Sequence, residues 1–393
     1  MAGLLKSNKH ESAVWKNCRI EDFCTTASGG TPLTTRREYY EGGHIPWLRS
    51  GEVAQGRVRH AEISITQAGL DNSSAKLFKK GTILVAMYGA TAGEVGILEF
   101  ESATNQAVCG VTPGPSVDGE FLFQALLLRK SALIKMAGGG AQPNISQEII
   151  RNFKIPLPPL AEQRKIAEIL RTWDEAIEVA ETELKAKQER KRWMMEKFMS
   201  RRPVQYVSGR ELRIGTIEQF ELAGIITLSR GKVISKKDIE GLPGTYPVYS
   251  SSIHNIGLFG RYGDYMFDEE MITWSVDGGG NFFHRPKHRF SITNVCGCMQ
   301  VDTKRINCAF LASQLQYLHK RLTFDYQSKA HPSVIRKMYN LWIPSIEEQV
   351  SMADAMAICD EQMLNLNNRT KALCAQKRGL MQKLLTGEVR VAA

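Results

Sequence analysis

The residues best suited to binding chemistry lie in one short stretch of the second half of the chain. From Asn281 to Arg289, cationic side chains are interleaved with aromatic ones, and the stretch is bounded by glycine and proline. Lys and Arg bind phosphates or guanine edges, while Asn and Gln can pair with adenine. On its residues alone, the stretch fits a loop that contacts DNA and a solvated surface loop equally well.

Metal binding is a second chemistry to weigh here. His284, His288, Cys296 and Cys298 have the spacing His-x3-His-x7-Cys-x-Cys. Zinc sites favour about two to four residues between their cysteines, whereas only Gly297 separates Cys296 from Cys298, a spacing too short for a typical zinc site. A basic loop followed by two buried thiols is the preferred interpretation, so no metal site is predicted.

Catalytic motifs are also missing from the sequence. No Asn/Asp-Pro-Pro-aromatic loop that could hold a flipped adenine occurs, and Gly231-Lys232 lacks the other residues of a phosphate-binding loop. The glycine runs 138–140 and 278–280 lack the strand–helix spacing of a nucleotide site and are interpreted as turns. No catalytic residue is predicted, although a nuclease or methyltransferase with an unrecognised motif remains an alternative.

A long internal repeat organises the chain around these segments. Glu162-Gln163 recurs as Glu348-Gln349, and Asp174 recurs as Asp360, each 186 positions later without a gap. A period of this length is too long for a solenoid and indicates a duplicated half-molecule.

The repeated segments are predicted to be long helices that pair with each other. Apolar residues follow an a/d heptad pattern from position 166 and again from position 352, interrupted by Lys187, Lys191 and Lys377. Pairing by a two-fold operation makes the helices antiparallel, and forty residues span roughly 60 Å. The predicted seam comprises Ile166, Leu170, Trp173, Ile177, Leu184, Met194, Phe198, Met352, Met356, Met363, Leu366, Leu373, Leu380 and Leu384.

Between the repeats, short apolar runs with glycine and proline punctuation predict strands and turns, and each segment carries one helical stretch near its end. The predicted fold is α+β: two mixed α/β domains separated by two long antiparallel coiled-coil helices, with a pseudo-two-fold repeat. The predicted organisation is a disordered segment 1–14, a globular domain 15–155, a helix 156–202, a second domain 203–342, and a second helix with tail 343–393.

Charge and composition indicate the kind of partner and the cellular compartment to expect. The net charge is +10, and most of the excess lies in the two globular segments, which suits a polyanionic partner. The sequence contains no run of eighteen apolar residues, so no membrane span is predicted. The first residues lack the apolar core of a secretory signal. Eight scattered cysteines favour a reducing compartment, so a cytoplasmic protein is expected.

Several motifs resemble those of the DNA-specificity (S) subunit of type I restriction–modification systems, over nearly the whole chain. The most specific are Ile155–Ile166 and the ending Lys383–Val391. Gly29-Gly30-Thr31-Pro32, Tyr88–Gly93 and Thr104-Asn105-Gln106 also look like parts of a family target-recognition domain. The second half departs from the pattern, because Ser345 replaces a usual proline and 228–232 lacks the Thr-Pro.

The resemblance implies a non-catalytic subunit in which each recognition domain reads one half of a bipartite target on double-stranded DNA. The helices would act as a conserved spacer that docks two methyltransferase subunits, joined by restriction/translocase subunits. S-adenosylmethionine, ATP and Mg are expected only in those partners. A coiled-coil scaffold that binds no DNA is the other alternative, and the recognised bases cannot be derived from the sequence.

With this family context, DNA contact becomes the favoured role for polar residues in both domains. The candidates are Arg36, Arg37, Arg49, Ser50, Tyr88, Asn105, Gln106, Gln142 and Asn144 in the first domain, and Ser250, Ser251, His254, Asn281, His284, Arg285, Lys287, His288, Arg289, Asn294, Lys329 and His331 in the second. Tyr39, Tyr40 and Trp47 are expected to be core residues instead.

Overall fold

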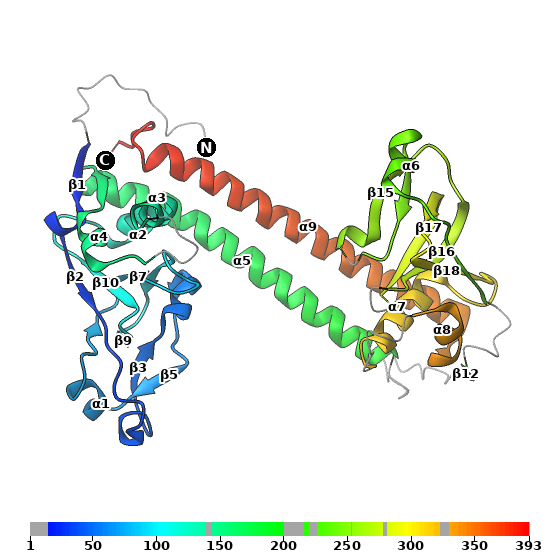
Figure 1. The fold of residues 1–393 in the computed structure, drawn as a ribbon, viewed down its shortest axis with the longest axis horizontal. Helices are drawn as coiled ribbons and strands as arrows, with labels where there is room; N and C mark the ends of the chain where they lie inside the picture. Colours follow the sequence, from blue (N-terminus) through cyan, green and yellow to red (C-terminus); the bar gives the residue numbers. More distant parts are fainter. Residues whose placement is uncertain are drawn as a thin grey trace. The chain divides into compact units, whose positions relative to one another are not determined.

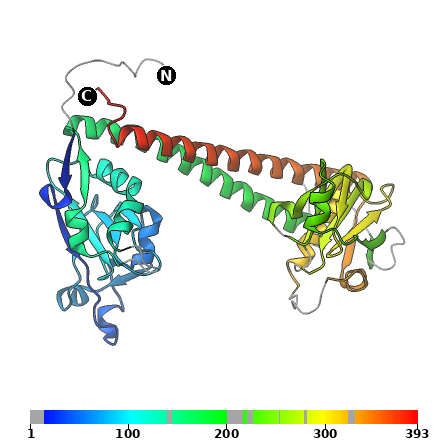
Figure 2. The ribbon, with the colours of Figure 1, turned by 45° about the horizontal axis from the view of Figure 1, so that its top comes forward.

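The chain divides into two compact units, residues 1–181 with 368–393 and residues 182–367. The computed structural model describes residues 15–138, 144–199, 216–219 (backbone), 226–252, 254–277, 281–322 and 330–392 (Figures 1 and 2). Each unit contains one globular domain and part of both long helices. The expected disordered segment 1–14 lies outside the described residues.

Two sheets of short apolar strands form the first globular domain. One has the order β2-β10-β7-β8-β4 and the other β5-β3-β9-β6. Every residue of β7 and β8 is buried because alternate side chains enter two different core clusters, one on each face. The strands are β2 (Cys24–Ser28), β3 (Ile45–Leu48), β4 (Arg57–Val58), β5 (Ile63–Ile65), β6 (Leu77–Phe78), β7 (Ile83–Ala86), β8 (Val95–Leu98), β9 (Ser102–Thr104) and β10 (Val108–Pro113).

Helices join the first domain to the long helices. The helical stretch expected late in this domain is found as α2 (Gly119–Leu128) and α3 (Lys130–Met136). Phe121 and Leu122 of α2 share a core cluster with Ile166 and Leu170 of the first long helix. The smaller helices α1 (Gln67–Asp71) and α4 (Gln147–Asn152) complete the domain.

The second globular domain is built on a sheet with the order β13-β18-β16-β17-β14-β15. Its helix α7 (Cys308–His319) packs on β16 and β17, and α8 (Pro332–Met338) follows it. The strands are β13 (Ile226–Arg230), β14 (Tyr246–Tyr249), β15 (Leu258–Tyr262), β16 (Phe267–Ser275), β17 (Phe282–Ile292) and β18 (Cys296–Val301), and α6 (Lys236–Gly241) lies between β13 and β14.

The basic stretch 281–289 is a strand, so its prediction as a loop was wrong. Residues 282–292 form β17, which pairs antiparallel with β16 from Trp274↔Phe282 to Phe267↔Phe290. The stretch has no regular apolar–polar alternation, which explains why its sequence did not reveal a strand. Pro286 lies where the ladder register shifts, a position at which its missing N–H is tolerated.

Each globular domain is closed by a small antiparallel ribbon directly before a long helix. In the first unit β1 (Lys16–Arg19) pairs with β11 (Lys154–Leu157). In the second unit β12 (Thr216–Gln219) pairs with β19 (Asn340–Ile343). Because β11 and β19 are 186 positions apart, the duplication extends into the backbone topology.

The repeated segments form the predicted long helices α5 (Leu160–Met199) and α9 (Ile346–Leu384). In the first unit, Ile166 and Leu170 near the start of α5 pack in one cluster with Met381 and Leu384 at the end of α9. In the second unit the end of α5 packs against the start of α9, where Phe198 contacts the cluster of Met352. The antiparallel pairing is therefore confirmed within each unit (Figures 1 and 2).

The predicted seam is the covered face of both helices. Each of its members is buried or half-buried in the structure, from Ile166 at the start of α5 to Leu384 at the end of α9. Among the described residues, no helix is both long and apolar enough to span a membrane.

Candidate nucleic-acid interface

In the first domain, the structure brings three of the recognised motif segments together. A Cβ on Gly29 would lie 2.1 Å from the Thr104 carbonyl oxygen, so the turn after β2 can approach β9 only with glycine there. The Gly30 N–H donates to the same oxygen at 2.9 Å. This contact places Thr31 beside the segment that follows β9.

A small polar network results at the domain surface. The Tyr88 hydroxyl donates to the Gln106 carbonyl at 2.6 Å, and the Thr31 hydroxyl donates to the Gln106 side chain. Tyr88 and Gln106 are exposed, whereas Asn105 is half-buried and its amide oxygen accepts from the Ala107 N–H at 3.2 Å. Tyr88 and Gln106 therefore remain available to a ligand, and Asn105 shapes the turn beside them.

The other candidates of the first domain lie elsewhere on its surface. Arg36, Arg37 and Arg49 are exposed and form ion pairs with neighbouring glutamates, and Ser50 follows Arg49 in a short 3-10 turn. Asn144 is exposed near the start of α4. Gln142 lies outside the described residues.

Trp47 is a core residue, as the sequence predicted. It is buried, and its indole N–H donates to the Gly30 carbonyl at 2.9 Å. Tyr40 is half-buried and donates to the Pro32 carbonyl at 2.6 Å, and Tyr39 is also half-buried. Trp47 and Tyr40 therefore hold the glycine turn through its carbonyl groups.

The second domain repeats the same arrangement with different side chains. A Cβ on Gly231 would lie 2.1 Å from the Ile292 carbonyl oxygen, which is the close approach that Gly29 makes in the first domain. Arg230 donates to the Asn294 carbonyl at 2.6 Å. The Thr293 hydroxyl donates to Ser250 at 2.9 Å, so Ser250 and Asn294 lie around the same turn.

The exposed cations of β17 give this domain a basic surface. Lys287 and Arg289 are exposed, and Arg289 lies 4.9 Å from the ring of Tyr265 and 3.3 Å from Asp268. His288 stacks on Phe290 with ring centroids 4.8 Å apart. Cations held beside aromatic rings can reach phosphates while the rings restrict their motion.

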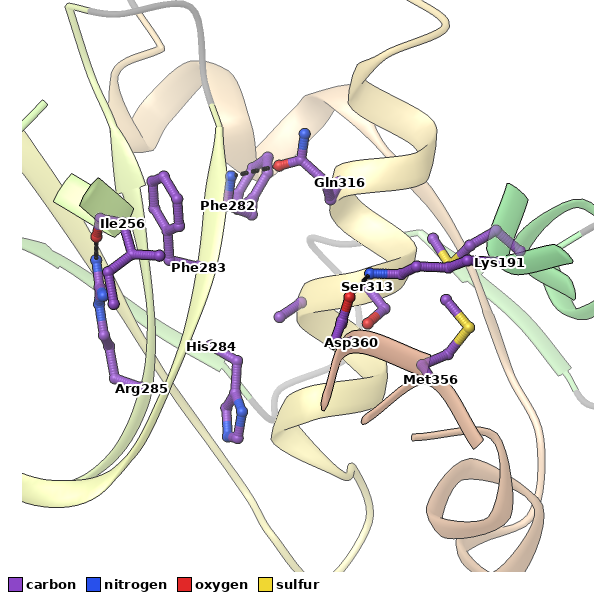
Figure 3. Close-up of a pocket in the computed structure, with 12 residues that line it drawn as sticks. Lys191, Ile256, Phe282, Phe283, His284, Arg285, Ser313, Gln316, Met356 and Asp360 are labelled. Carbon is purple, nitrogen blue, oxygen red and sulfur yellow. Dashed lines mark hydrogen bonds and ion pairs between the residues drawn. The ribbon is translucent and has the colours of Figure 1, made fainter. Parts of the chain in front are cut away.

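Arg285 has a different environment from its neighbours, because it is only 2% exposed. Its guanidinium lies 3.6 Å from the Tyr249 ring centroid and donates to Thr273 Oγ1 at 2.9 Å. It also donates to the Ile256 carbonyl at 2.7 Å (Figure 3). Burial lowers the pKa of this guanidinium. A side chain so enclosed cannot reach a phosphate, so we correct its predicted DNA contact to a positioning role.

The segment that Arg285 holds has an unusual backbone. Asn255 and Ile256 have φ values of 47° and 49°, in the left-handed region that a β-branched residue such as Ile rarely adopts. The bond to the Ile256 carbonyl fixes this turn, which also carries the exposed candidate His254. Ser251 is tied to the same region, since its carbonyl accepts from Ser275 at 2.9 Å.

The remaining candidates have structural partners. His284 Nε2 lies 2.6 Å from a carboxylate oxygen of Glu270, and Asn281 accepts from Gln316 at 3.3 Å. His331 is exposed and caps the start of α8. Lys329 lies outside the described residues.

The predicted buried thiols are found at Cys296 and Cys298. Burial raises the pKa of Cys296 to about 12, so it is a neutral thiol at physiological pH. The Cys298 sulfur lies 2.9 Å from the Ser229 hydroxyl.

The repeated glutamines have a role that the sequence did not reveal. Gln163 is 1% exposed; its amide donates to the carbonyls of Pro158 and Ser116 at 2.8 and 3.2 Å, and its oxygen accepts from the Asp118 N–H at 2.8 Å. Asp118 is the N-cap of α2, so this glutamine joins the long helix to the recognition domain.

The second copy makes the same set of bonds. Gln349 donates to the carbonyls of Pro344 and Arg305 at 2.9 and 3.0 Å and accepts from the Asn307 N–H at 2.8 Å. Asn307 caps α7 as Asp118 caps α2. We call these two sets of bonds the glutamine clamps. The repeated Glu-Gln pair was the only signal for them in the sequence.

The glutamates that precede the clamps have diverged. Glu162 is buried and accepts from Arg390 at 2.8 Å and from the Val391 N–H at 3.2 Å, which fastens the C-terminal segment to the first unit. Burial favours a higher pKa for Glu162, but the hydrogen bonds from Arg390 and Val391 outweigh it and lower the pKa overall. Glu348 instead accepts from the Ser345 N–H at 3.1 Å at the start of α9.

Two of the lysines that interrupt the seam, Lys191 and Lys377, have partners across it. Lys377 lies 2.5 Å from Asp174 in the first unit, and Lys191 pairs with Asp360 in the second. Both members of one pair are 186 positions from their counterparts in the other. Polar pairs within an apolar seam fix the register of two helices, and these two fix the same antiparallel register.

Comparison with known proteins agrees with this architecture. Residues 13–189 and 215–373 match the family model of the type I restriction modification DNA specificity domain. The specificity subunit of the type I restriction enzyme MjaVIII from Methanocaldococcus jannaschii is 28% identical over 409 residues, which cover 96% of this chain and 93% of that protein. A putative type I specificity subunit of Mycoplasma pneumoniae is 29% identical over 214 residues, covering 53% of this chain and 82% of that protein.

A solved structure shares the fold as a whole. The S subunit of the type I restriction-modification system from M. genitalium superposes with a TM-score of 0.68 at 17% identity, covering 97% of this chain and 99% of that one. The family model matches both halves of the duplication, and together the matches include most of the chain. The chain therefore belongs to the type I restriction–modification DNA specificity family.

Proposed function

We propose that this protein is a non-catalytic DNA-specificity subunit in which each globular domain reads one half of a bipartite target. The observation that carries the proposal is the pair of glutamine clamps. Both clamps attach a recognition domain to a long helix through identical bonds, while the surfaces that the two domains present differ. Identical attachment with different surfaces is what two different half-sites require.

The two surfaces offer different readout chemistry. The first presents the neutral donors and acceptors of Tyr88 and Gln106, which suit base edges. The second presents Lys287 and Arg289, which suit phosphates and guanine. Arg285 supports the second surface from inside the domain.

We assign catalysis to partner subunits. Methyl transfer with S-adenosylmethionine, and translocation or cleavage with ATP and Mg, would take place on two methyltransferase subunits and on restriction/translocase subunits. Membership of the specificity family supports this division, as do relatives that are themselves named specificity subunits.

Domain replacement tests whether each domain reads one half-site independently of the other. We expect that exchanging residues 15–155 for the equivalent segment of another specificity subunit changes one half of the methylated motif and leaves the other intact. The Gln163 clamp binds only backbone atoms of residues 116 and 118, so a foreign domain that keeps the apolar face of α2 can form the same bonds with other side chains at these positions. Genome-wide mapping of methylated adenines in a host with the complete system measures the result.

The matched control exchanges residues 203–342 and should change the other half-site. A replacement that alters both halves, or neither, would contradict the modular model. Loss of all methylation in both exchanges would favour a scaffold without a role in site selection, provided that the complex still assembles.

The exposed sides of the long helices are proposed to bind the methyltransferase subunits. In the second unit, Trp193, Ile358 and Leu364 on these helices are each more than half exposed. Large apolar side chains exposed on helices are typical anchors of a protein interface.

Replacing Trp193 with Glu is expected to weaken binding of the methyltransferase subunit by about tenfold or more, because aromatic anchors often contribute ~2 kcal/mol or more to an interface. Co-purification and calorimetry of the complex measure the effect. Gln188→Glu introduces the same charge at an exposed position of α5 and serves as the control. Equal affinities of the two variants would place the methyltransferase elsewhere.

A further inference from the structure

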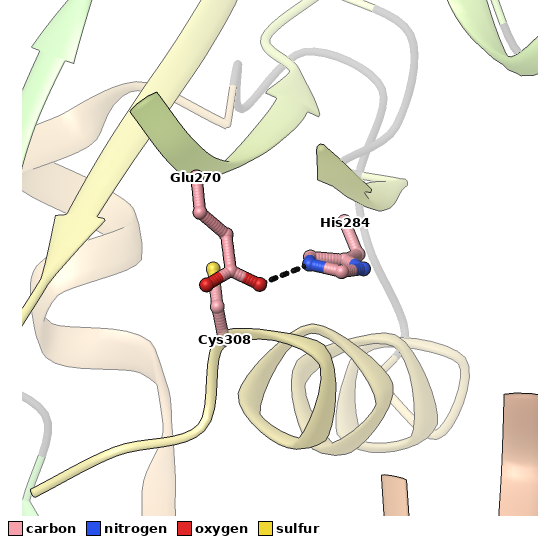
Figure 4. A group of neighbouring side chains, drawn as sticks. All are labelled: Glu270, His284 and Cys308. Atoms are coloured by element: carbon pink, nitrogen blue, oxygen red, sulfur yellow. Dashed lines mark hydrogen bonds and ion pairs between the residues drawn. The ribbon is translucent and has the colours of Figure 1, made fainter. Parts of the chain in front are cut away.

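A group of three potential metal ligands lies in the second recognition domain. The ligand atoms of Glu270, His284 and Cys308 all lie within 4.8 Å of one another (Figure 4). Among the residues that the structure describes, this is the one group of three or more His, Cys, Asp and Glu side chains close enough to share an ion. Its members come from β16, β17 and α7.

Local structure explains why Glu270 joins this group. The β16–β17 ladder pairs Glu269 with His288 and Met271 with Arg285, so Glu270 alone faces two residues of β17. This is a β-bulge, an irregularity that redirects a side chain and is common beside functional sites. Glu270 lies two residues before Ile272, the ladder partner of His284, so its carboxylate is on the same face of the sheet as the imidazole, with 2.6 Å between Oε1 and Nε2.

The third member is held in place by the end of a helix. Cys308 is buried at the first position of α7, directly after the cap Asn307. Asn307 accepts from the Phe310 N–H at 2.9 Å and donates its own N–H to Gln349. The glutamine clamp therefore fixes the residue next to Cys308, and the three side chains meet on elements that are fixed independently.

The donor set selects the kind of ion. A thiolate, an imidazole and a carboxylate together suit Zn²⁺, whereas Mg²⁺ and Ca²⁺ prefer oxygen ligands throughout. Bonds of about 2.0–2.3 Å to a tetrahedral Zn²⁺ place ligand atoms roughly 3.3–3.8 Å apart. Side-chain movements of about 1 Å would bring this group to that geometry.

We propose that Glu270, His284 and Cys308 bind one Zn²⁺ ion. Binding would ionise the Cys308 thiol, so the dipositive ion would be balanced by one thiolate and one carboxylate. The ion would cross-link the bulged strand pair to α7 and stiffen the sheet that carries Lys287 and Arg289. His284 would then be a metal ligand in place of the DNA contact that its sequence suggested.

A pocket beside His284 can supply a fourth ligand. His284 also lines a pocket of about 350 Å³, together with Ser313, Gln316 and Lys191 (Figure 3). Three protein ligands leave one tetrahedral position, which a water molecule from this pocket can occupy.

The first experiment uses the full-length protein without an affinity tag, because a polyhistidine tag would itself bind metal. After treatment with a chelator and its removal, the protein is titrated with Co²⁺ and then with Zn²⁺. We expect a thiolate-to-cobalt charge-transfer band in the near ultraviolet that saturates at one ion per chain and disappears when Zn²⁺ is added. No such band, or a band that does not saturate at one equivalent, would overturn the proposal.

Variants then identify the ligands. Cys308→Ser and His284→Gln should each weaken Zn²⁺ binding at least about tenfold, since loss even of an outer-shell partner commonly costs that much. Cys374→Ser and His288→Gln are the matched controls, with one exposed cysteine and one neighbouring histidine, and should bind as the unaltered protein does. Unchanged binding by Cys308→Ser, or equal losses in the controls, would overturn the proposal.

Folding is monitored separately by circular dichroism, and the cobalt band of the unaltered protein reports thiolate ligation without any variant. Zinc should also raise the melting temperature of the unaltered protein, because an ion that binds the folded state stabilises it. The methylated motif of the complete system is measured independently of metal binding and melting temperature. Failure of the zinc proposal would therefore leave the proposed DNA specificity intact.

Discussion

Replacing Gln163 with alanine is expected to lower the free energy of unfolding of the first unit by about 3 kcal/mol. The change removes three hydrogen bonds and leaves the Asp118 N–H and the carbonyls of Pro158 and Ser116 without this partner. Buried groups that lose a partner cost about 1–3 kcal/mol each, and partial access of water to the rim keeps the sum near the lower end. Urea denaturation followed by circular dichroism measures the change.

Two further variants separate the clamp from a general loss of glutamine. Gln349→Ala should cost a similar amount in the second unit, because its bonds are equivalent. Gln188→Ala, at an exposed position of α5, should cost less than about 0.5 kcal/mol. If Gln163→Ala were no more destabilising than Gln188→Ala, the clamp would not carry the attachment of the domain.

Replacing Lys377 with methionine is expected to destabilise the first unit by about 2–3 kcal/mol. Lys377 is 7% exposed and forms its ion pair with Asp174 at 2.5 Å. Methionine fills the space but leaves the carboxylate without this cation, and removing one member of a buried pair is costly. The Gln124 amide, 2.7 Å from Asp174, still donates a hydrogen bond to the carboxylate, and this bond limits the loss of stability to about 2–3 kcal/mol.

The duplication provides an internal control for this prediction. Lys191 forms the equivalent pair with Asp360, which is more than half exposed, so Lys191→Met should cost less than about 1 kcal/mol. Adding Asp174→Asn to Lys377→Met should cost less than the sum of the single changes, because the two residues interact directly. Equal effects of the two lysine changes would show that burial does not distinguish the pairs.

The glutamine clamps offer a physical reason for modular recognition domains. On the side of each domain, the clamp bonds involve backbone atoms alone: Ser116 and Asp118 in the first, Arg305 and Asn307 in the second. The clamp bonds therefore place no constraint on the side chains of these four residues. The divergence of the reading surfaces and the constancy of the repeat are compatible for this reason.

Prediction from sequence succeeded where the pattern is local. The heptad spacing from Ile166 and from Met352 predicted both helices and their covered face, because helical periodicity is written directly in the order of residues. The prediction failed at 281–289, where Pro286 was taken to indicate a loop. A β-bulge accommodates that proline within a strand, and the bulge depends on the partner strand β16.

The candidate site shows the same division. Tyr88 and Gln106 were named from sequence, and the structure places them in one network. Arg285 was named with its exposed neighbours, but alternation along β17 turns it into the domain. Exposure of a single cation depends on which face of a sheet is covered, and sequence spacing does not give that information.

By itself, the sequence determined the duplication, the two mixed domains and the helix pair, because repeats and periodicity are properties of residue order. Only the tertiary structure decided what the repeated polar residues do. Gln163, Gln349, Lys191 and Lys377 gain their roles from partners that lie between 42 and 203 positions away, or across a turn of backbone. Contacts over such distances arise when the chain packs, and no local pattern encodes them.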